Sequence, residues 1–244
     1  LKPGQRKILY ACFKKGLTVK QEIKVSQLAG YVSEQTSYHH GETSLMETII
    51  NLSQIYVGTN NMNILKPIGQ FGTRLQGGKD ASSPRYIFTT ISENTKELFN
   101  SEDFPLLEYL DDDGQSIEPK YYVPTLPLIL INGTDGIGTG FSSTIPCFNP
   151  DDLKYCLEKL LEDPEYEIPE LTPWYKGFQG TITKIYTNKC SNIFSLAGES
   201  VFNDIDGKIG IVYDDFDCKQ DIIDNWKPYK LERIFTLANR RKTL

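Results

Sequence analysis

The amino-acid sequence predicts an α+β fold, in which short helices come first and strands follow a glycine-rich stretch. Two helices are expected over 3–15 and 25–34, where apolar residues recur at the three- and four-residue spacing that lines one helix face. A third is expected from Thr43 or Ser44, whose hydroxyl suits an N-cap, to about residue 56. The glycine-rich stretch 58–90 then ends in a predicted strand, 87–90.

Three short helices followed by a loop and a strand are typical of the winged-helix form of the helix-turn-helix, with the glycine-rich stretch as the wing. Arg6 and Lys7 are expected to point outward from the start of the first helix. Winged helices commonly bind DNA, but the shape alone does not establish that function.

The second half of the chain predicts a mixture of helix and strand. Leu128–Ile131 is predicted as a buried strand that enters a loop with four glycines. The acidic run 111–114 predicts a turn, and Asn149 the start of a helix that ends near Glu162. Further strands are expected at 181–186 and 209–213, and a helix, bent at Pro228, at 221–244.

Charge is distributed unevenly along the chain, although the whole carries a net charge of −6. Residues 1–86 contain 11 Lys or Arg and 5 Asp or Glu, whereas the remainder contains 15 and 27. A basic first part on an acidic body can attract phosphate to one face and repel it elsewhere. The alternative is an ordinary solvated surface whose charges happen to segregate.

Composition excludes several other classes of protein. The five cysteines show no CxxC spacing, which indicates reduced thiols in an intracellular protein without a zinc site. The longest apolar run, 126–131, is interrupted by Pro127 and is too short to cross a bilayer, so a soluble protein is expected. The chain begins at Leu1 without a signal peptide, and we expect it to be part of a longer protein.

Tyr86 is the first candidate for catalysis, because Arg85 stands beside it at the end of a basic, glycine-containing segment. A phenol, with a reference pKa of about 10, is a poor nucleophile at neutral pH. A neighbouring guanidinium can stabilise the phenolate and can also bridge a phosphate oxygen. Pro84 is expected to hold both residues rigidly at the start of the predicted strand. The alternative is a tyrosine that only packs against that strand.

His39 and His40 are further candidates, because they lie just before the third helix, where backbone amides can also meet phosphate. An imidazole can hydrogen-bond a phosphate oxygen or a leaving hydroxyl, although a histidine bonded within a turn is equally consistent with the sequence. Ile137 stands between glycines in a loop that lacks the Lys-Ser/Thr ending of a P-loop. It is either buried locally or exposed as a wedge that enters between base pairs.

Five motifs in order along the chain resemble the breakage-reunion core of type IIA DNA topoisomerases, and more the eukaryotic and large-DNA-virus enzymes than bacterial gyrase. They are LKPGQRK at 1–7, SYHHGE at 37–42, PIGQFGTR at 67–74, GGKDASSPRYIFT at 77–89 and LINGTDGIGTGF at 130–141. The resemblance is strong from residue 1 to about 185.

The resemblance implies a role for each candidate. Tyr86 would attack a DNA phosphodiester and form a 5′-phosphotyrosine link, Arg85 would stabilise the charge on the phosphate, and His40 would contact the scissile region. The implied DNA contacts are Lys2, Arg6, Lys7, His39, Arg74 and Lys79, with Ile137 as the wedge.

The same resemblance implies three domains. These are a winged-helix cleavage domain over 1–120, a mixed α/β tower or shoulder domain over 121–200, and a return segment into a coiled coil over 201–244. It also implies Mg²⁺, ATP, double-stranded DNA, a homodimer and the nucleus, or a viral factory or the cytoplasm for a virus-encoded protein. No metal ligands are expected in this chain, because the Toprim and ATPase modules would lie upstream.

Two other interpretations remain open from the sequence. One is a winged-helix DNA-binding module without catalysis, in which Tyr86 only stacks or packs. The other is a virus- or parasite-encoded homologue that has lost strand passage, for which the short 187–205 region would be the main support.

Overall fold

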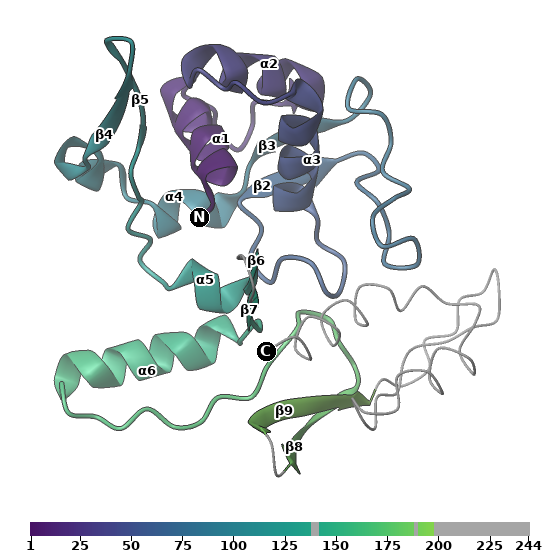
Figure 1. Cartoon of the computed structure of the whole chain (residues 1–244), viewed down its shortest axis with the longest axis vertical. Coiled ribbons are helices and arrows are strands. Elements are labelled where there is room, and N and C mark those ends of the chain that lie inside the picture. The colour runs from purple at the N-terminus through teal and green to yellow at the C-terminus, as the bar shows by residue number, and fades with distance from the viewer. Residues whose placement is uncertain (138–141, 188–189, 198–244) are drawn as a thin grey trace. The chain divides into compact units, whose positions relative to one another are not determined.

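The computed structural model describes residues 1–137, 142–187 and 190–197 (Figure 1). It divides the chain into two compact units, Leu1–Ile129 and a second that begins at Leu130. The first unit therefore extends past residue 120, where the sequence placed a boundary. The expected assignment of cleavage, tower and return domains stays a prediction.

Three helices begin the first unit, as the sequence predicted: α1 (Pro3–Lys14), α2 (Val25–Gln35) and α3 (Glu42–Ser53). The expected cap of the third helix is wrong, because α3 begins at Glu42 with Gly41 as its N-cap. Glycine is tolerated at an N-cap, and an acidic residue in the first turn complements the positive end of the helix dipole.

A three-stranded antiparallel sheet lies beside these helices, in the order β1-β3-β2. Its strands are β1 (Ile23–Lys24), β2 (Leu65–Ile68) and β3 (Phe88–Ile91), so the predicted strand is confirmed one residue later than expected. Thr89 of β3 is opposite Ile23 on one side and Pro67 on the other. Figure 1 shows the loop between β2 and β3 extending beyond the ends of both strands.

One hydrophobic core holds the helices and the sheet together. The apolar stripes of the three helices meet buried residues of the strands and of the segments beside them. Fully buried members include Ile8, Leu9, Leu28, Leu45, Ile49, Leu65 and Ile91. The spacing that predicted the helices therefore also identified most of this core.

The first unit continues with small elements that the sequence did not predict. They are α4 (Glu93–Leu98), a 3₁₀ helix (Ser101–Leu106) and a hairpin of β4 (Tyr109–Asp112) and β5 (Gln115–Pro119). The expected turn is confirmed at the hairpin tip, where Asp113 and Gly114 have positive φ angles of 50° and 82°. The two strands are short, and β5 shows no alternation of buried and exposed residues, so the sequence carried no periodic signal for them.

The predicted strand at Leu128–Ile131 is wrong, because these residues form the short helix α5. A run of four apolar residues does not distinguish a buried strand from a buried helical turn. The glycine-containing segment after it forms an antiparallel hairpin of β6 (Thr134–Ile137) and β7 (Ser142–Ile145).

The second unit confirms two other predictions. Helix α6 (Pro150–Glu162) begins after Asn149, whose side chain accepts a hydrogen bond from the Asp151 amide. The predicted strand near 181 is β8 (Thr181–Thr187), paired antiparallel with β9 (Cys190–Ala197). The elements expected at 209–213 and 221–244 lie outside the described residues.

The composition gave expectations about the cysteines and about membrane-spanning segments, which can be compared with the described part of the chain. Cys12, Cys147 and Cys156 are buried free thiols, consistent with the expected reduced state. None of the helices in the described ranges combines the length and the apolar character needed to span a membrane.

Candidate functional site

Tyr86 lies in a turn immediately before β3, not at the start of the strand as expected. Its backbone amide donates to the Ser83 carbonyl oxygen at 2.9 Å, which closes the turn. The residue is 78% exposed, more than any other aromatic residue among the exposed large hydrophobic residues of the first unit. The interpretation that Tyr86 merely packs against the strand is therefore wrong.

The start of α2 holds this turn in place. The Ser26 amide donates to the Pro84 carbonyl oxygen at 3.1 Å, and the Val25 amide donates to the Ile87 carbonyl oxygen at 3.0 Å. The first amides of a helix have no partner within the helix, so the turn supplies acceptors that they need. The ring of Tyr86 thus projects from a backbone that is bonded on both sides.

The loop between β2 and β3 is also bonded to itself. The Ser82 amide donates to the Gln70 carbonyl oxygen and the Gly78 amide to the Thr73 carbonyl oxygen, both at 2.9 Å. The two Asp80 carboxylate oxygens accept from the backbone amide and the hydroxyl of Thr73, each at 2.8 Å. Partial burial acts to raise the pKa of Asp80, but these hydrogen bonds outweigh it and lower the pKa.

The end of α3 anchors the same loop. The Gln54 side-chain amide, which is buried, donates to the Phe71 carbonyl oxygen at 2.9 Å. Gly78 has a φ of +83°, and a Cβ there would lie 2.6 Å from both Gln54 Nε2 and Tyr56 Oη. The loop can approach α3 this closely only because the residue at 78 has no side chain.

The predicted cations differ in their exposure. Lys2, Lys79 and Arg85 are exposed. Arg74 is partly buried, and burial lowers the pKa of its guanidinium. Arg6 donates through Nη1 to the Leu1 carbonyl oxygen at 3.0 Å. Three cationic side chains of the candidate site are therefore placed at the surface, where phosphate can reach them.

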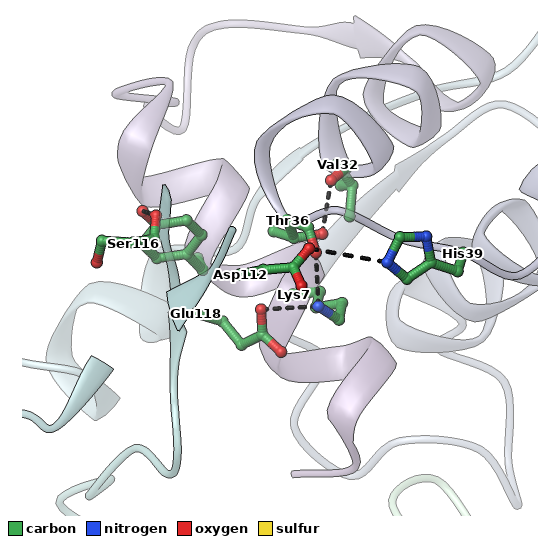
Figure 2. A network of polar contacts seen from close by, with 8 residues as sticks. Lys7, Val32, Thr36, His39, Asp112, Ser116 and Glu118 are labelled. Carbon is green, nitrogen blue, oxygen red and sulfur yellow. Dashed lines mark hydrogen bonds and ion pairs between the residues drawn. The ribbon is translucent and has the colours of Figure 1, made fainter. Parts of the chain in front are cut away.

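Lys7 does not point outward as expected. Its ammonium donates to the Thr36 carbonyl oxygen at 2.7 Å and to Glu118 Oε2 at 2.9 Å. The exposed fractions of the Lys7 and Glu118 side chains are 15% and 3%. Figure 2 shows both contacts of the Lys7 ammonium. No sequence pattern pointed to Glu118, because its partner is 111 residues away along the chain.

His39 and His40 are both exposed in the segment between α2 and α3. The His39 Nε2 atom is 3.7 Å from Asp112 Oδ2 at the tip of the β4–β5 hairpin (Figure 2). The ring centroid of His40 is 5.4 Å from that of Tyr38, in an edge-on arrangement. Tyr86 and the histidines thus lie near opposite ends of the same helix: the turn with Tyr86 bonds to the start of α2, and the histidines follow its end.

The backbone of Ile137 ends β6, opposite Ser142 of β7. Its side chain lies outside what the structure describes, so its role as a wedge stays a prediction. Within the described ranges, no group of three or more His, Cys, Asp or Glu residues is arranged to hold a metal ion.

Comparisons with known proteins give one consistent result for this chain. The family model for DNA gyrase/topoisomerase IV (A subunit) matches residues 1–210. Among solved structures, a Plasmodium falciparum topoisomerase II DNA-binding, cleavage and re-ligation domain matches with a TM-score of 0.75 and 48% identity, over 84% of this chain and 27% of that one.

Curated relatives give the same result. The chain is 58% identical over 181 residues to DNA topoisomerase 2 of Candida albicans, and 52% identical over 202 residues to the mitochondrial DNA topoisomerase 2 of Dictyostelium discoideum. These alignments cover 74% and 82% of this chain but only 12% and 16% of the relatives. The mixed α/β fold is thus shared with a topoisomerase II DNA-binding, cleavage and re-ligation domain. The chain belongs to the family of type IIA DNA topoisomerases.

Proposed function

We propose that the chain is the DNA breakage-reunion core of an ATP-dependent type IIA topoisomerase, which makes a transient double-strand break so that a second duplex can pass. The observation that carries this proposal is the exposed ring of Tyr86 on a turn bonded to α2, directly after the exposed Arg85. A nucleophile that must reach a DNA phosphate needs both this accessibility and a fixed backbone.

The chemistry assigned to Tyr86 is a transesterification. Its phenolic oxygen forms a bond to the phosphorus while the bond from phosphorus to the 3′ oxygen breaks, and the proton lost by the phenol is balanced by the proton gained at the 3′ oxygen. One phosphate ester replaces another, so the reverse reaction rejoins the strand. Arg85 stabilises the charge on the phosphate, and His40 contacts the scissile region.

DNA binding is assigned to a winged helix. The order α1, β1, α2, α3, β2, β3 supports this assignment, with the loop between β2 and β3 as the wing. The wing carries two of the proposed backbone contacts, Arg74 and Lys79, and Lys2 and Arg6 add to them from the start of the chain. Ile137 is assigned as the wedge that bends the duplex.

The remaining parts of the activity are assigned to the longer protein. Mg²⁺ would be held by a Toprim domain and ATP by an ATPase domain, and two copies would act as a homodimer in the nucleus. The tower and coiled-coil assignments for 121–200 and 201–244 belong to this proposal.

Covalent trapping tests the proposal directly. The full-length protein is incubated with Mg²⁺ and with DNA labelled at either the 5′ or the 3′ side of the cleavage site, and is then denatured. We expect the label on the 5′ phosphate to remain bound to the wild type and to be absent from Tyr86→Phe, with DNA affinity largely kept.

Tyr121→Phe is the matched control, because Tyr121 is also exposed, at 58%, but lies outside the turn. It should trap DNA as the wild type does. A covalent adduct on Tyr86→Phe would remove this residue from the role. No adduct on the wild type under any metal condition would leave a winged-helix DNA-binding module.

A further inference from the structure

The segment that carries His39 and His40 starts at Thr36, at the end of α2. Thr36 is fully buried, and its hydroxyl donates to the Val32 carbonyl oxygen at 2.7 Å. Ser37, the next residue, has a φ of +46°, so the chain reverses sharply there. The direction of the histidine segment therefore depends on how firmly Thr36 is held.

Lys7 holds Thr36 from outside the helix. A carbonyl at a helix C-terminus has no partner within the helix, and the Lys7 ammonium supplies one at 2.7 Å. The charge of Lys7 is in turn balanced by Glu118 of β5 at 2.9 Å, in a place almost closed to water. A buried carboxylate needs such a partner, so the three groups form one unit that links α1, α2 and the hairpin.

The hairpin makes a second contact with the same segment. Asp112, at the end of β4, is 3.7 Å from the His39 imidazole. Figure 2 shows Glu118 directed at Lys7 and Asp112 at His39 from the same hairpin. The β4–β5 hairpin thus contacts the histidine segment through Lys7 at its start and directly at His39.

We propose that Lys7 and Glu118 are positioning residues that set the His39–His40 segment for DNA strand cleavage, and that Lys7 is not a phosphate contact. This inference rests on the proposed function, because that function is what gives the histidines a role at the scissile region of the DNA. Its basis is the juxtaposition of Lys7, Glu118 and the Thr36 carbonyl oxygen, which leaves the Lys7 ammonium occupied inside the protein.

The first test separates positioning from phosphate contact. DNA affinity of the full-length protein is measured against salt concentration for Lys7→Met. A lost phosphate contact lowers the slope of log K against log salt by about 0.9. We expect an unchanged slope, together with a cleavage rate at saturating DNA that is about 10-fold to 100-fold lower, since small displacements of a reacting group have effects of that size.

Lys120→Met is the control for the loss of a lysine from this region. Lys120 pairs with Glu108 beside the same hairpin, but both side chains are about half exposed or more. It should leave both the salt slope and the cleavage rate unchanged. Lys7→Arg, which keeps the charge and the donors, should recover most of the cleavage rate. A lowered salt slope for Lys7→Met would overturn the proposal.

The second test asks whether Glu118 acts through the histidines. Single-turnover cleavage is measured for Glu118→Gln in the wild type and in a His39→Ala/His40→Ala background, over times long enough to follow a much slower reaction. We expect Glu118→Gln to lower the cleavage rate about 10-fold in the wild type and less than about 2-fold in the background without the two histidines. The reason is that substitutions of residues that act as one unit do not have additive effects. An equal loss in both would mean a purely structural role and would overturn the proposal.

Tyr86→Phe, measured in parallel, separates the two proposals. If the wild type forms no covalent adduct, the proposed function fails, and if Tyr86→Phe still forms one, only the role of Tyr86 fails. If Tyr86→Phe is inactive but Glu118→Gln and Lys7→Met cleave at the wild-type rate, only the positioning proposal fails.

Discussion

Gly78 is the position at which a single methyl group should loosen the loop between β2 and β3. A Cβ at Gly78 would lie 2.6 Å from Gln54 Nε2 and from Tyr56 Oη, in a backbone conformation with a φ of +83°. The Gln54 amide cannot move aside freely, because it is buried and donates to the Phe71 carbonyl oxygen. Gly78→Ala should therefore break the link between this loop and the end of α3.

The neighbouring Gly77 provides the control. Its φ is also positive, at +59°, but a Cβ there would meet nothing within 4 Å. Gly77→Ala should cost only the strain of a left-handed alanine, about 1 kcal/mol. Gly78→Ala adds the loss of a hydrogen bond from a buried amide, about 1–2 kcal/mol. The loop should then open about 5–30 times more often in Gly78→Ala than in Gly77→Ala.

Hydrogen exchange measures this opening. In the full-length protein, peptides covering 69–82 report the Gly78 and Ser82 amides, both of which donate within the loop. We expect exchange to be faster in Gly77→Ala than in the wild type, and faster again in Gly78→Ala. Equal exchange in the two variants would refute the reasoning, because it would mean that the contact with Gln54 does not hold the loop.

Three further predictions concern single side chains. The lowered pKa of Asp80 means that its hydrogen bonds to Thr73 stabilise the loop above the unfolded pKa, near 3.9, and are lost as the pH falls through the lower, folded pKa. Exchange of the loop, corrected for intrinsic rates, should rise below about pH 4 in the wild type, and Asp80→Asn should show faster exchange without that acid step. Burial raises the pKa of Cys12 to about 12, so iodoacetamide at pH 8 should modify it only after unfolding, as read by peptide mass spectrometry. Ile137→Ala should reduce DNA bending, measured by energy transfer, more than it reduces DNA affinity, and unchanged bending would count against the wedge.

The sequence predicted the first three helices well, because each has an apolar stripe at helical spacing. Leu28 and Val32 of α2, for example, are both fully buried. It failed where four apolar residues, Leu128–Ile131, were too few to show a period. It also failed at the start of α3, where the structure uses Gly41 although hydroxyl side chains stand close by.

Some residues of the candidate site were also found from the sequence, whereas the position of others could not be predicted from it. The sequence identified Tyr86 and Arg85 as candidates because a proline-containing segment beside a strand is a local feature, and both residues are exposed. The interior position of Lys7 could not be predicted, because its partners Thr36 and Glu118 come from distant parts of the chain. Nothing in the sequence around Glu118 distinguishes it from the other acidic residues of the second half.

Helix α2 sets a distance within the proposed site. Its first amides bond to the turn that carries Tyr86, and the segment with the two histidines departs from its last residue. An inserted or deleted residue within the helix would shift its end by about 1.5 Å and rotate it by about 100° relative to its start. The length of α2 should therefore be as strictly constrained in this family as the identity of the residues at either end, even though none of its own side chains is assigned a part in the chemistry.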